Sequence, residues 1–235
     1  MIKFENTEVL GWESAIRGMR NPMNSWEKSD SGWSPDWPRD NYIFVDEDTD
    51  DYYELAIGPN DQKLMTALRN AGTDHRKFMR MITVYVDITA PLYWWKEFDT
   101  YKVGTVANSC STMHKIHAKE FTVDDFSHEH LFTEENLRYD AEPDSLKLLN
   151  TIIDALNVYR LAYLEEGDKS IWWQLIQLLP SSYNQKRTVM LNYEVLANIY
   201  KSRKNHKLDE WSSGFIEWSL SLPYSELITG GTING

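Results

Sequence analysis

The side chains best placed to do chemistry lie on one predicted helix, residues 192–203. At about 100° per residue, Asn192 and Arg203 share one face of this helix, with an apolar stripe between them. Polar groups at the ends of an apolar stripe need partners where they are buried. Two interpretations follow: Asn192 caps the helix while the stem of Arg203 covers its surface, or Arg203 is directed at an anionic ligand.

Cations are concentrated around this helix, although the chain as a whole is acidic. The 235 residues contain 24 Lys and Arg against 36 Asp and Glu, which gives a formal net charge of −12. Such a charge argues against a general binder of nucleic-acid backbones. Within residues 186–207, by contrast, Glu194 alone opposes a basic cluster: Lys186, Arg187, Lys201, Arg203, Lys204 and Lys207. This local reversal of charge favours a small anionic ligand or an acidic partner surface.

Histidine pairs, an acidic run and the single cysteine are weaker candidates. Histidines at 114 and 117, and at 128 and 130, are close in sequence, but no HExxH motif accompanies them, and we expect no metal site. The acidic run 45–51 lacks EF-hand spacing, so a solvated loop is favoured over a calcium site. Cys110 lies among small residues; it is a nucleophile if a base lowers its pKa, and otherwise a small buried hydrophobe.

A strand and several helices are predicted to position these residues. The segment 78–89 alternates apolar β-branched residues with others, which is typical of a strand with one buried face. Pro91 follows it at the first turn of a helix, and capping residues precede the later helices. The expected helices are 61–71 after an Asn60 cap, 92–102, 145–166 after an Asp144 or Ser145 cap, 169–179 after Asp168, 192–203, and one that carries Trp211, Phe215 and Trp218.

This pattern indicates an α+β fold with a largely helical second half. No composition shift or linker marks a boundary, so we expect a single domain over residues 1–235. No stretch approaches the ~20 apolar residues that span a bilayer, and the first residues lack the pattern of a secretory signal. One cysteine also suggests a reducing compartment. We therefore expect a cytoplasmic protein.

Two segments resemble the flavin-dependent thymidylate synthases. In the first, residues 88–115, the family motif R-H-R-x-x-S-x-N-E-x-S-x-R falls without a gap on residues 100–112. The second, residues 191–211, is similar to the family segment N-x-R-x-L-x-(H/N)-F-x-x-L-R. Together they cover about a fifth of the chain, in the family's order and at its distance. Upstream, His75 stands where the family has a Gly-His ahead of its strand.

The resemblance implies an α+β fold with a small sheet and long helices, in a homotetramer whose active sites are shared between subunits. It implies methylation of dUMP to dTMP with FAD, NADPH and methylenetetrahydrofolate, or of another pyrimidine nucleotide. Arg203 would be the catalytic residue that binds and polarises the pyrimidine, and Cys110 would also contact the substrate. The implied cofactor-binding residues are His75, Lys102, Thr105, Asn192 and Asn198.

Several positions depart from the family motifs and leave a second function open. Lys102 in place of Arg loses the planar fork that binds phosphate. Glu194 in place of Arg reverses a charge, so we expect it to repel the FAD pyrophosphate and weaken FAD binding. The other departures are Thr100, Tyr101, Cys110 and Thr112. The alternative is therefore a non-catalytic homologue that acts as a nucleotide-binding or interaction module.

The aromatic content suggests where subunits meet. The chain has ten Trp and thirteen Tyr, with tryptophan pairs at 94–95 and 172–173. Exposed on a monomer, these four rings would make a large apolar patch. We therefore expect the homotetramer to be built around the helical second half and these two pairs.

Overall fold

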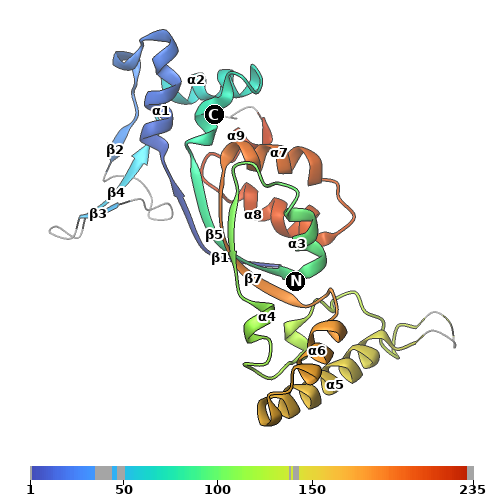
Figure 1. Ribbon diagram of the computed structural model, residues 1–235. Helices are drawn as coiled ribbons and strands as arrows, with labels where there is room; N and C mark the ends of the chain where they lie inside the picture. Colours follow the sequence, from blue (N-terminus) through green and yellow to red (C-terminus); the bar gives the residue numbers. More distant parts are fainter. Residues whose placement is uncertain (1, 35–43, 47–50, 138, 140–142, 232–235) are drawn as a thin grey trace. The chain divides into compact units, whose positions relative to one another are not determined.

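The computed structural model describes residues 2–34, 44–46, 51–137, 139 and 143–231 (Figure 1). The strands are β1 (Lys3–Leu10), β2 (Gly32–Ser34), β3 (Phe44–Asp46), β4 (Asp51–Ala56), β5 (Thr83–Pro91), β6 (Val106–Ser109) and β7 (Asn184–Asn192). The α-helices are α1 (Trp12–Arg20), α2 (Pro59–Asn70), α3 (Leu92–Phe98), α4 (Thr112–Lys115), α5 (Ser145–Glu166), α6 (Lys169–Leu178), α7 (Tyr193–Arg203), α8 (Ile216–Leu220) and α9 (Glu226–Thr229). The predicted α+β class is confirmed.

Two sheets are present in the described residues. One has the strand order β1-β5-β7-β6, and the other is an antiparallel sheet in the order β2-β4-β3. Strand β7 lies in the half of the chain that was predicted to be largely helical, so that prediction missed a strand. The acidic run 45–51 falls partly on β3 and β4, and its residues 47–50 lie outside the described residues.

The predicted strand 78–89 is β5, displaced toward the C-terminus. Its apolar face is buried as the alternation indicated, with Val84 and Ile88 both 0% exposed and Val86 1% exposed. The strand starts later than predicted because residues Arg76–Arg80 form a 3₁₀ helix that buries Phe78. The chain therefore turns once before it enters the sheet.

Internal contacts divide the chain into two compact units. Unit 1 consists of Met1–Lys3, Ile88–Thr100 and Asn108–Thr188, and unit 2 of Phe4–Asp87, Tyr101–Ala107 and Val189–Gly235. Four of the five boundaries fall inside strands β1, β5, β6 and β7, and the fifth lies between Thr100 and Tyr101, just after α3. This explains why the sequence shows no boundary.

In unit 1, α5 and α6 form the predicted helix pair with the predicted caps. The Asp144 side chain accepts a hydrogen bond from the Lys147 N–H (2.7 Å), and Asp168 accepts one from the Ser170 N–H (2.8 Å). Gly167 ends α5 in the left-handed conformation. The apolar faces of both helices join one core cluster: Ile116, Phe121, Phe126, Leu149, Ile153, Leu156 and Leu175.

The tryptophans of α3 are core residues of unit 1, which corrects the expectation that they are exposed. Trp94 and Trp95 are 0% and 1% exposed, and both rings pack against Phe98. Trp95 Nε1 donates to the Gln185 carbonyl (2.9 Å), and the guanidinium of Arg187 lies 4.1 Å from the ring centroid of Trp95. In the second pair, Trp173 remains 42% exposed. Trp94 and Trp95 therefore cannot form the exposed patch expected at a tetramer interface.

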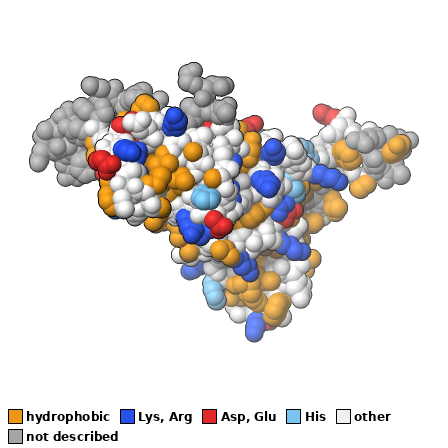
Figure 2. All heavy atoms as spheres, turned by 90° about the horizontal axis from the view of Figure 1, so that it is seen from above, with side chains coloured by type: hydrophobic (Ala, Val, Ile, Leu, Met, Phe, Trp, Pro, Cys, Tyr) orange, Lys and Arg blue, Asp and Glu red, His pale blue; other side chains and the backbone are white. Residues whose placement is uncertain are grey.

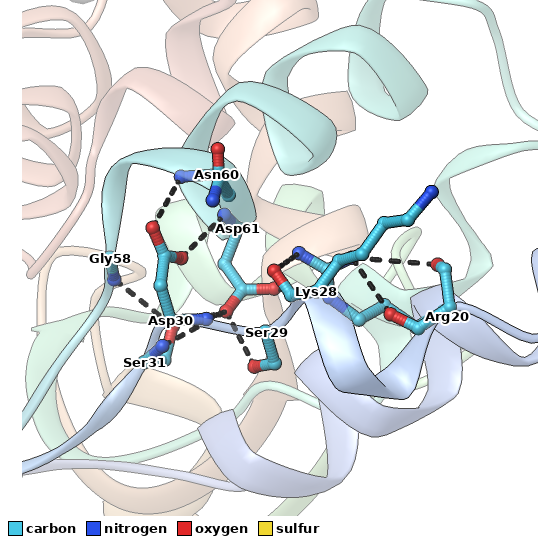
Figure 3. Close-up of polar contacts among 9 residues, drawn as sticks. Arg20, Lys28, Ser29, Asp30, Ser31, Gly58, Asn60 and Asp61 are labelled. Atoms are coloured by element: carbon cyan, nitrogen blue, oxygen red, sulfur yellow. Dashed lines mark hydrogen bonds and ion pairs between the residues drawn. The ribbon is translucent and has the colours of Figure 1, made fainter.

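In unit 2, a buried carboxylate ties the segment after α1 to the start of α2 (Figure 3). Asp61, 0% exposed, accepts hydrogen bonds from Arg20 Nε (2.6 Å) and from the hydroxyls of Ser29 (2.7 Å) and Ser31 (2.6 Å). Burial raises the pKa of Asp61, but the hydrogen bonds from Ser31, Ser29 and Arg20 outweigh it, and its pKa is lowered overall. Asp61 therefore holds the start of α2 against the segment that follows α1.

The cap of α2 differs from the prediction. Asn60 lies inside the helix, because Pro59 occupies the first turn and Gly58 is the N-cap residue. The Asp30 side chain accepts from the backbone N–H groups of Asn60 (2.9 Å) and Asp61 (3.1 Å). The capping group thus comes from a distant segment.

None of the helices within the described residues is both long and apolar enough to cross a membrane.

Candidate functional site

Helix α7 carries Asn198 and Arg203 and begins at the N-cap residue Asn192, as the sequence indicates. The Asn192 side-chain oxygen accepts a hydrogen bond from the Val195 N–H (3.1 Å), which makes Asn192 the N-cap. The Tyr193 N–H donates to the carbonyl of Ile82, the residue before β5 (3.1 Å), which joins the start of α7 to this point of the chain. The first turn of α7 is therefore fixed in position.

The loop Tyr101–Thr105 packs along one face of α7. Near the start of the helix, a Cβ on Gly104 would lie 2.9 Å from Asn192 Nδ2 and 3.1 Å from Val195 Cγ2. Near its end, Arg203 Nε donates to the hydroxyl of Tyr101 (2.9 Å). One short loop thus contacts both Asn192 and Arg203. The two residues share a face, as the helix geometry predicted.

Arg203 is held between aromatic rings rather than spread over the surface. Its guanidinium carbon lies 4.9 Å from the ring centroid of Trp211 and 5.6 Å from that of Tyr101. Trp211 is 0% exposed and belongs to a π-helical turn, Glu210–Phe215, a form that is frequent at functional sites. Arg203 itself is half-buried. The Asn192 cap of the first interpretation is present, and the Arg203 guanidinium contacts two aromatic rings.

Thr105 and Lys102 occupy different environments in the same loop. The Thr105 hydroxyl oxygen is buried and has no hydrogen-bond partner within the part of the chain that the structure describes. Lys102 is exposed, beside Val103, which is 91% exposed. Buried hydroxyls are normally hydrogen-bonded, so the orphaned Thr105 oxygen indicates a place for a ligand or water.

Glu194 and Asn198 are paired with arginines that the sequence analysis missed. Glu194, 5% exposed, forms ion pairs with Arg80 and with Arg76 (3.4 Å). Arg76 Nη2 donates to the Asn198 side-chain oxygen (2.9 Å). The hydrogen bond and charge of Glu194 raise the pKa of Arg80. The negative charge of Glu194 is therefore offset by two guanidinium groups.

A sequence signal for these arginines exists in hindsight. Arg76 and Arg80 are four residues apart in the 3₁₀ helix Arg76–Arg80, and both reach the first turn of α7. His75, the predicted cofactor ligand, is exposed immediately before them, and its backbone N–H donates to the Gly72 carbonyl (3.1 Å). The structure thus brings the His75 segment beside the helix that carries Asn198.

Cys110 belongs to unit 1, whereas the other predicted site residues belong to unit 2. Its thiol is exposed, which corrects the expectation of a buried hydrophobe. Its backbone N–H donates to the Lys186 carbonyl (2.9 Å), and its carbonyl accepts from Gln185 Nε2 (2.9 Å). It lines a cavity of about 460 Å³ together with Lys3, Thr89, Ser111, Thr112, Lys119, Thr122, Asp124, Asp125, Tyr183, Asn184, Gln185 and Lys186.

Two features make this cavity polar. The Asn184 side-chain oxygen is buried and has no hydrogen-bond partner among the described residues. Burial, with smaller contributions from Asp125 and Cys110, raises the pKa of Tyr183, so its hydroxyl stays protonated at neutral pH. The wall therefore offers an amide acceptor, a phenol donor and lysine ammonium groups.

The basic cluster predicted at 186–207 is divided between the two units. In unit 1, Arg187 forms an ion pair with Asp99 (2.8 Å). In unit 2, Arg203 contacts Tyr101 and Trp211. Figure 2 shows Lys and Arg side chains spread over the described part of one face, with Asp and Glu sparser. Across the described ranges, no group of three or more His, Cys, Asp or Glu could hold a metal ion.

Comparisons with known proteins identify the fold. No family model matches the sequence. No curated protein matches it either. Among solved structures, thymidylate synthase X (ThyX) from Helicobacter pylori with FAD and dUMP superposes with a TM-score of 0.64 at 17% identity, over 97% of this chain and 96% of that chain.

Two further structures agree with this result. A second structure of the Helicobacter pylori flavin-dependent enzyme with FAD and dUMP gives a TM-score of 0.61 at 17% identity, over 95% of this chain and 96% of that chain. A UMP/dUMP methylase, PolB from Streptomyces cacaoi bound with 5-Br dUMP, gives 0.51 at 12% identity, over 88% and 78%. The chain therefore has the fold of the flavin-dependent thymidylate synthases, as the two resembling segments predicted.

Proposed function

We propose that this chain binds FAD and a pyrimidine nucleotide, and that it methylates dUMP or a related nucleotide with methylenetetrahydrofolate and NADPH. The observation that carries the proposal is the packing of loop Tyr101–Thr105 against both Asn192 and Arg203. These are the two segments whose motifs resemble the family, and they are in contact. The similar folds were solved with FAD and dUMP, which supports the choice of ligands.

The residues of unit 2 fit a flavin in two respects. The buried Thr105 hydroxyl lacks a partner among the described residues, and a flavin phosphate or ring oxygen would supply one. The Glu194 charge is compensated by Arg76 and Arg80, so an anionic cofactor meets no net repulsion there. A bound flavin would supply hydride chemistry.

Arg203 is suited to hold the pyrimidine. The hydrogen bond to Tyr101 and the Trp211 ring fix the plane of its guanidinium. A fixed guanidinium stabilises negative charge on a pyrimidine oxygen better than a flexible one, because it does not need to reorganise during the reaction. We propose Arg203 as the catalytic residue. His75, Lys102, Thr105, Asn192 and Asn198 are the proposed cofactor-binding residues.

The Cys110 cavity in unit 1 is the proposed place for part of the nucleotide. Lys3 and Lys186 offer positive charge to a phosphate, and Tyr183 and Asn184 offer a donor and an acceptor. From the resemblance to the flavin-dependent thymidylate synthases, we also propose that active sites are shared between subunits of a homotetramer in the cytoplasm.

A second candidate is the non-catalytic nucleotide-binding or interaction module. It is favoured by the intrachain contacts of two proposed ligand-binding residues: Arg203 is engaged by Tyr101, and Asn198 by Arg76. If these contacts persist in the presence of ligands, both side chains have a purely structural role.

Purified protein tests the proposal directly. We expect a yellow protein with flavin absorbance at about 450 nm, and calorimetry should show dUMP binding. Arg203→Ala should weaken dUMP binding by about 2–4 kcal/mol, whereas Lys201→Ala, an exposed change on the same helix, should leave it unchanged. Protein that binds neither FAD nor dUMP would refute the proposal and favour the non-catalytic module.

A further inference from the structure

We propose that Arg76 and Arg80 form a binding site for a phosphate or diphosphate group, and that Glu194 holds their guanidinium groups in place. The proposal deepens the proposed function and rests on it where the diphosphate is that of FAD. The sequence suggested that Glu194 repels the FAD pyrophosphate, whereas here Glu194 positions the arginines that bind a phosphate group.

The geometry places one arginine on each oxygen of the same carboxylate. Arg76 Nε lies 3.4 Å from Glu194 Oε1, and Arg80 Nε contacts Oε2. Arg76 is further fixed by its bond to Asn198 (2.9 Å). Among the described residues, Arg76 Nη1 and both Nη groups of Arg80 have no hydrogen-bond acceptor. The Glu194 carboxylate therefore contacts the Nε groups and leaves terminal N–H donors of both arginines available to a ligand.

The local charge favours an anion. Two guanidinium groups face one carboxylate, and Asp74 is the other acid close enough to affect Arg80. A third arginine, Arg69, lies close enough to Arg76 that its pKa is lowered by burial and by that neighbouring positive charge. These three arginines and two acids together carry a net charge of +1. An anion at this place would relieve the repulsion between the arginines.

The exposure of the two arginines suits a binding site. The Arg76 side chain is 15% exposed and held at two points, whereas that of Arg80 is 54% exposed. One donor is therefore positioned in advance, and the other can close on a ligand from solvent. Guanidinium groups match anions that carry several oxygens, because each presents parallel N–H donors in a plane. This chemistry points to a phosphate or diphosphate.

The site also accounts for the charge reversal at residue 194. The resemblance places an arginine of the family at this position, on α7. Here the cations come from the 3₁₀ helix Arg76–Arg80, and the carboxylate of Glu194 holds them. Positive charge is thus kept at the first turn of α7 although the residue on the helix itself is acidic.

Calorimetric titration with inorganic pyrophosphate, FAD and riboflavin tests the site. Riboflavin carries no phosphate and so reports the ring alone. We expect Arg80→Ala to weaken pyrophosphate and FAD binding at least about tenfold and to leave riboflavin unchanged. Lys77→Ala, the matched loss of one exposed cation on the same turn, should change no Kd more than about twofold.

The outcomes separate this inference from the proposed function. Wild-type protein that binds pyrophosphate but not FAD or riboflavin supports the anion site and contradicts the flavin proposal. If the Arg80→Ala variant binds FAD as tightly as wild type does, the anion site is overturned and the flavin proposal stands. Equal weakening by Arg80→Ala and Lys77→Ala also overturns it, because general charge would then explain the effect. Circular dichroism and Tm confirm that each variant is folded, and Arg80 is exposed enough for its loss to be tolerated.

Discussion

Replacing Arg203 by alanine should destabilise the protein by more than a surface substitution does. The change removes a hydrogen bond from a charged donor to the Tyr101 hydroxyl, worth about 1.5–3 kcal/mol. It also removes a cation–π contact with the buried Trp211 ring, worth about 1–2 kcal/mol. Because the same guanidinium makes both contacts, we expect a loss of about 2–4 kcal/mol in the free energy of unfolding. An exposed helix residue would lose less than about 1 kcal/mol.

A double-mutant cycle with Tyr101→Phe isolates the contact. The phenylalanine keeps the ring and removes only the hydroxyl, so this variant alone should lose about 1–2 kcal/mol. Urea unfolding of wild type, both single variants and the double variant, followed by circular dichroism at one protein concentration, gives the coupling energy. We expect about 1–2 kcal/mol. Additive losses, within about 0.5 kcal/mol, would refute the bond between Arg203 and Tyr101.

Three other substitutions and one measurement of mass test separate features of the protein. Gly104→Ala should cost about 1 kcal/mol more than Gly167→Ala in urea unfolding, since both have positive φ but only Gly104 faces Asn192 and Val195 closely. Asp61→Asn should lose about 3–5 kcal/mol at pH 7, because it leaves Arg20 buried without its partner. In wild type the pKa of Asp61 is lowered, so the stability contributed by its ionised carboxylate is fully present above pH ~4 and is lost as the pH falls through the folded-state pKa. Asp61→Asn should lack this pH dependence in acid unfolding curves. Glu194→Arg should lower Tm, since it would place a third guanidinium beside Arg76 and Arg80; an unchanged Tm would contradict those ion pairs. Light scattering should give a tetramer, and a mass near 27.6 kDa at micromolar concentration would contradict it.

The helices of the second half were predictable because their signals are local. Asp144, Asp168 and Asn192 each cap a helix by accepting a hydrogen bond from a backbone N–H two or three residues later. Such a bond depends on sequence spacing alone. The same holds for Gly167, whose positive φ ends α5. These elements therefore follow from a few adjacent residues.

Strand β7 could not be predicted in the same way, because its burial pattern depends on distant groups. Gln185 is buried in this strand, where its side chain donates to the Cys110 carbonyl and accepts from Arg187 Nε. Only Val189 and Leu191 give an apolar alternation, and two residues are too few to indicate a strand. Polar residues that are satisfied by another segment look like surface residues in the sequence.

The site shows the same division between local and distant information. Helix geometry predicted the common face of Asn192 and Arg203, since both lie on α7. The partner of Arg203 lies 102 residues away at Tyr101, and the partners of Glu194 lie 118 and 114 residues away at Arg76 and Arg80. No spacing rule connects residues so far apart. Only the fold reveals that these departures from the family motif have partners.

These partners bear on whether the departures mark a lost site or an altered one. Stability alone requires a buried carboxylate to have a cation, so one arginine beside Glu194 needs no functional reason. It does not require a second arginine, nor does it explain a buried Thr105 hydroxyl that has no partner among the described residues. Both features cost free energy in the absence of a ligand, by charge repulsion and by an unmade hydrogen bond. An anionic ligand with oxygen acceptors would remove both costs, and this favours a rebuilt binding site over a degenerate one.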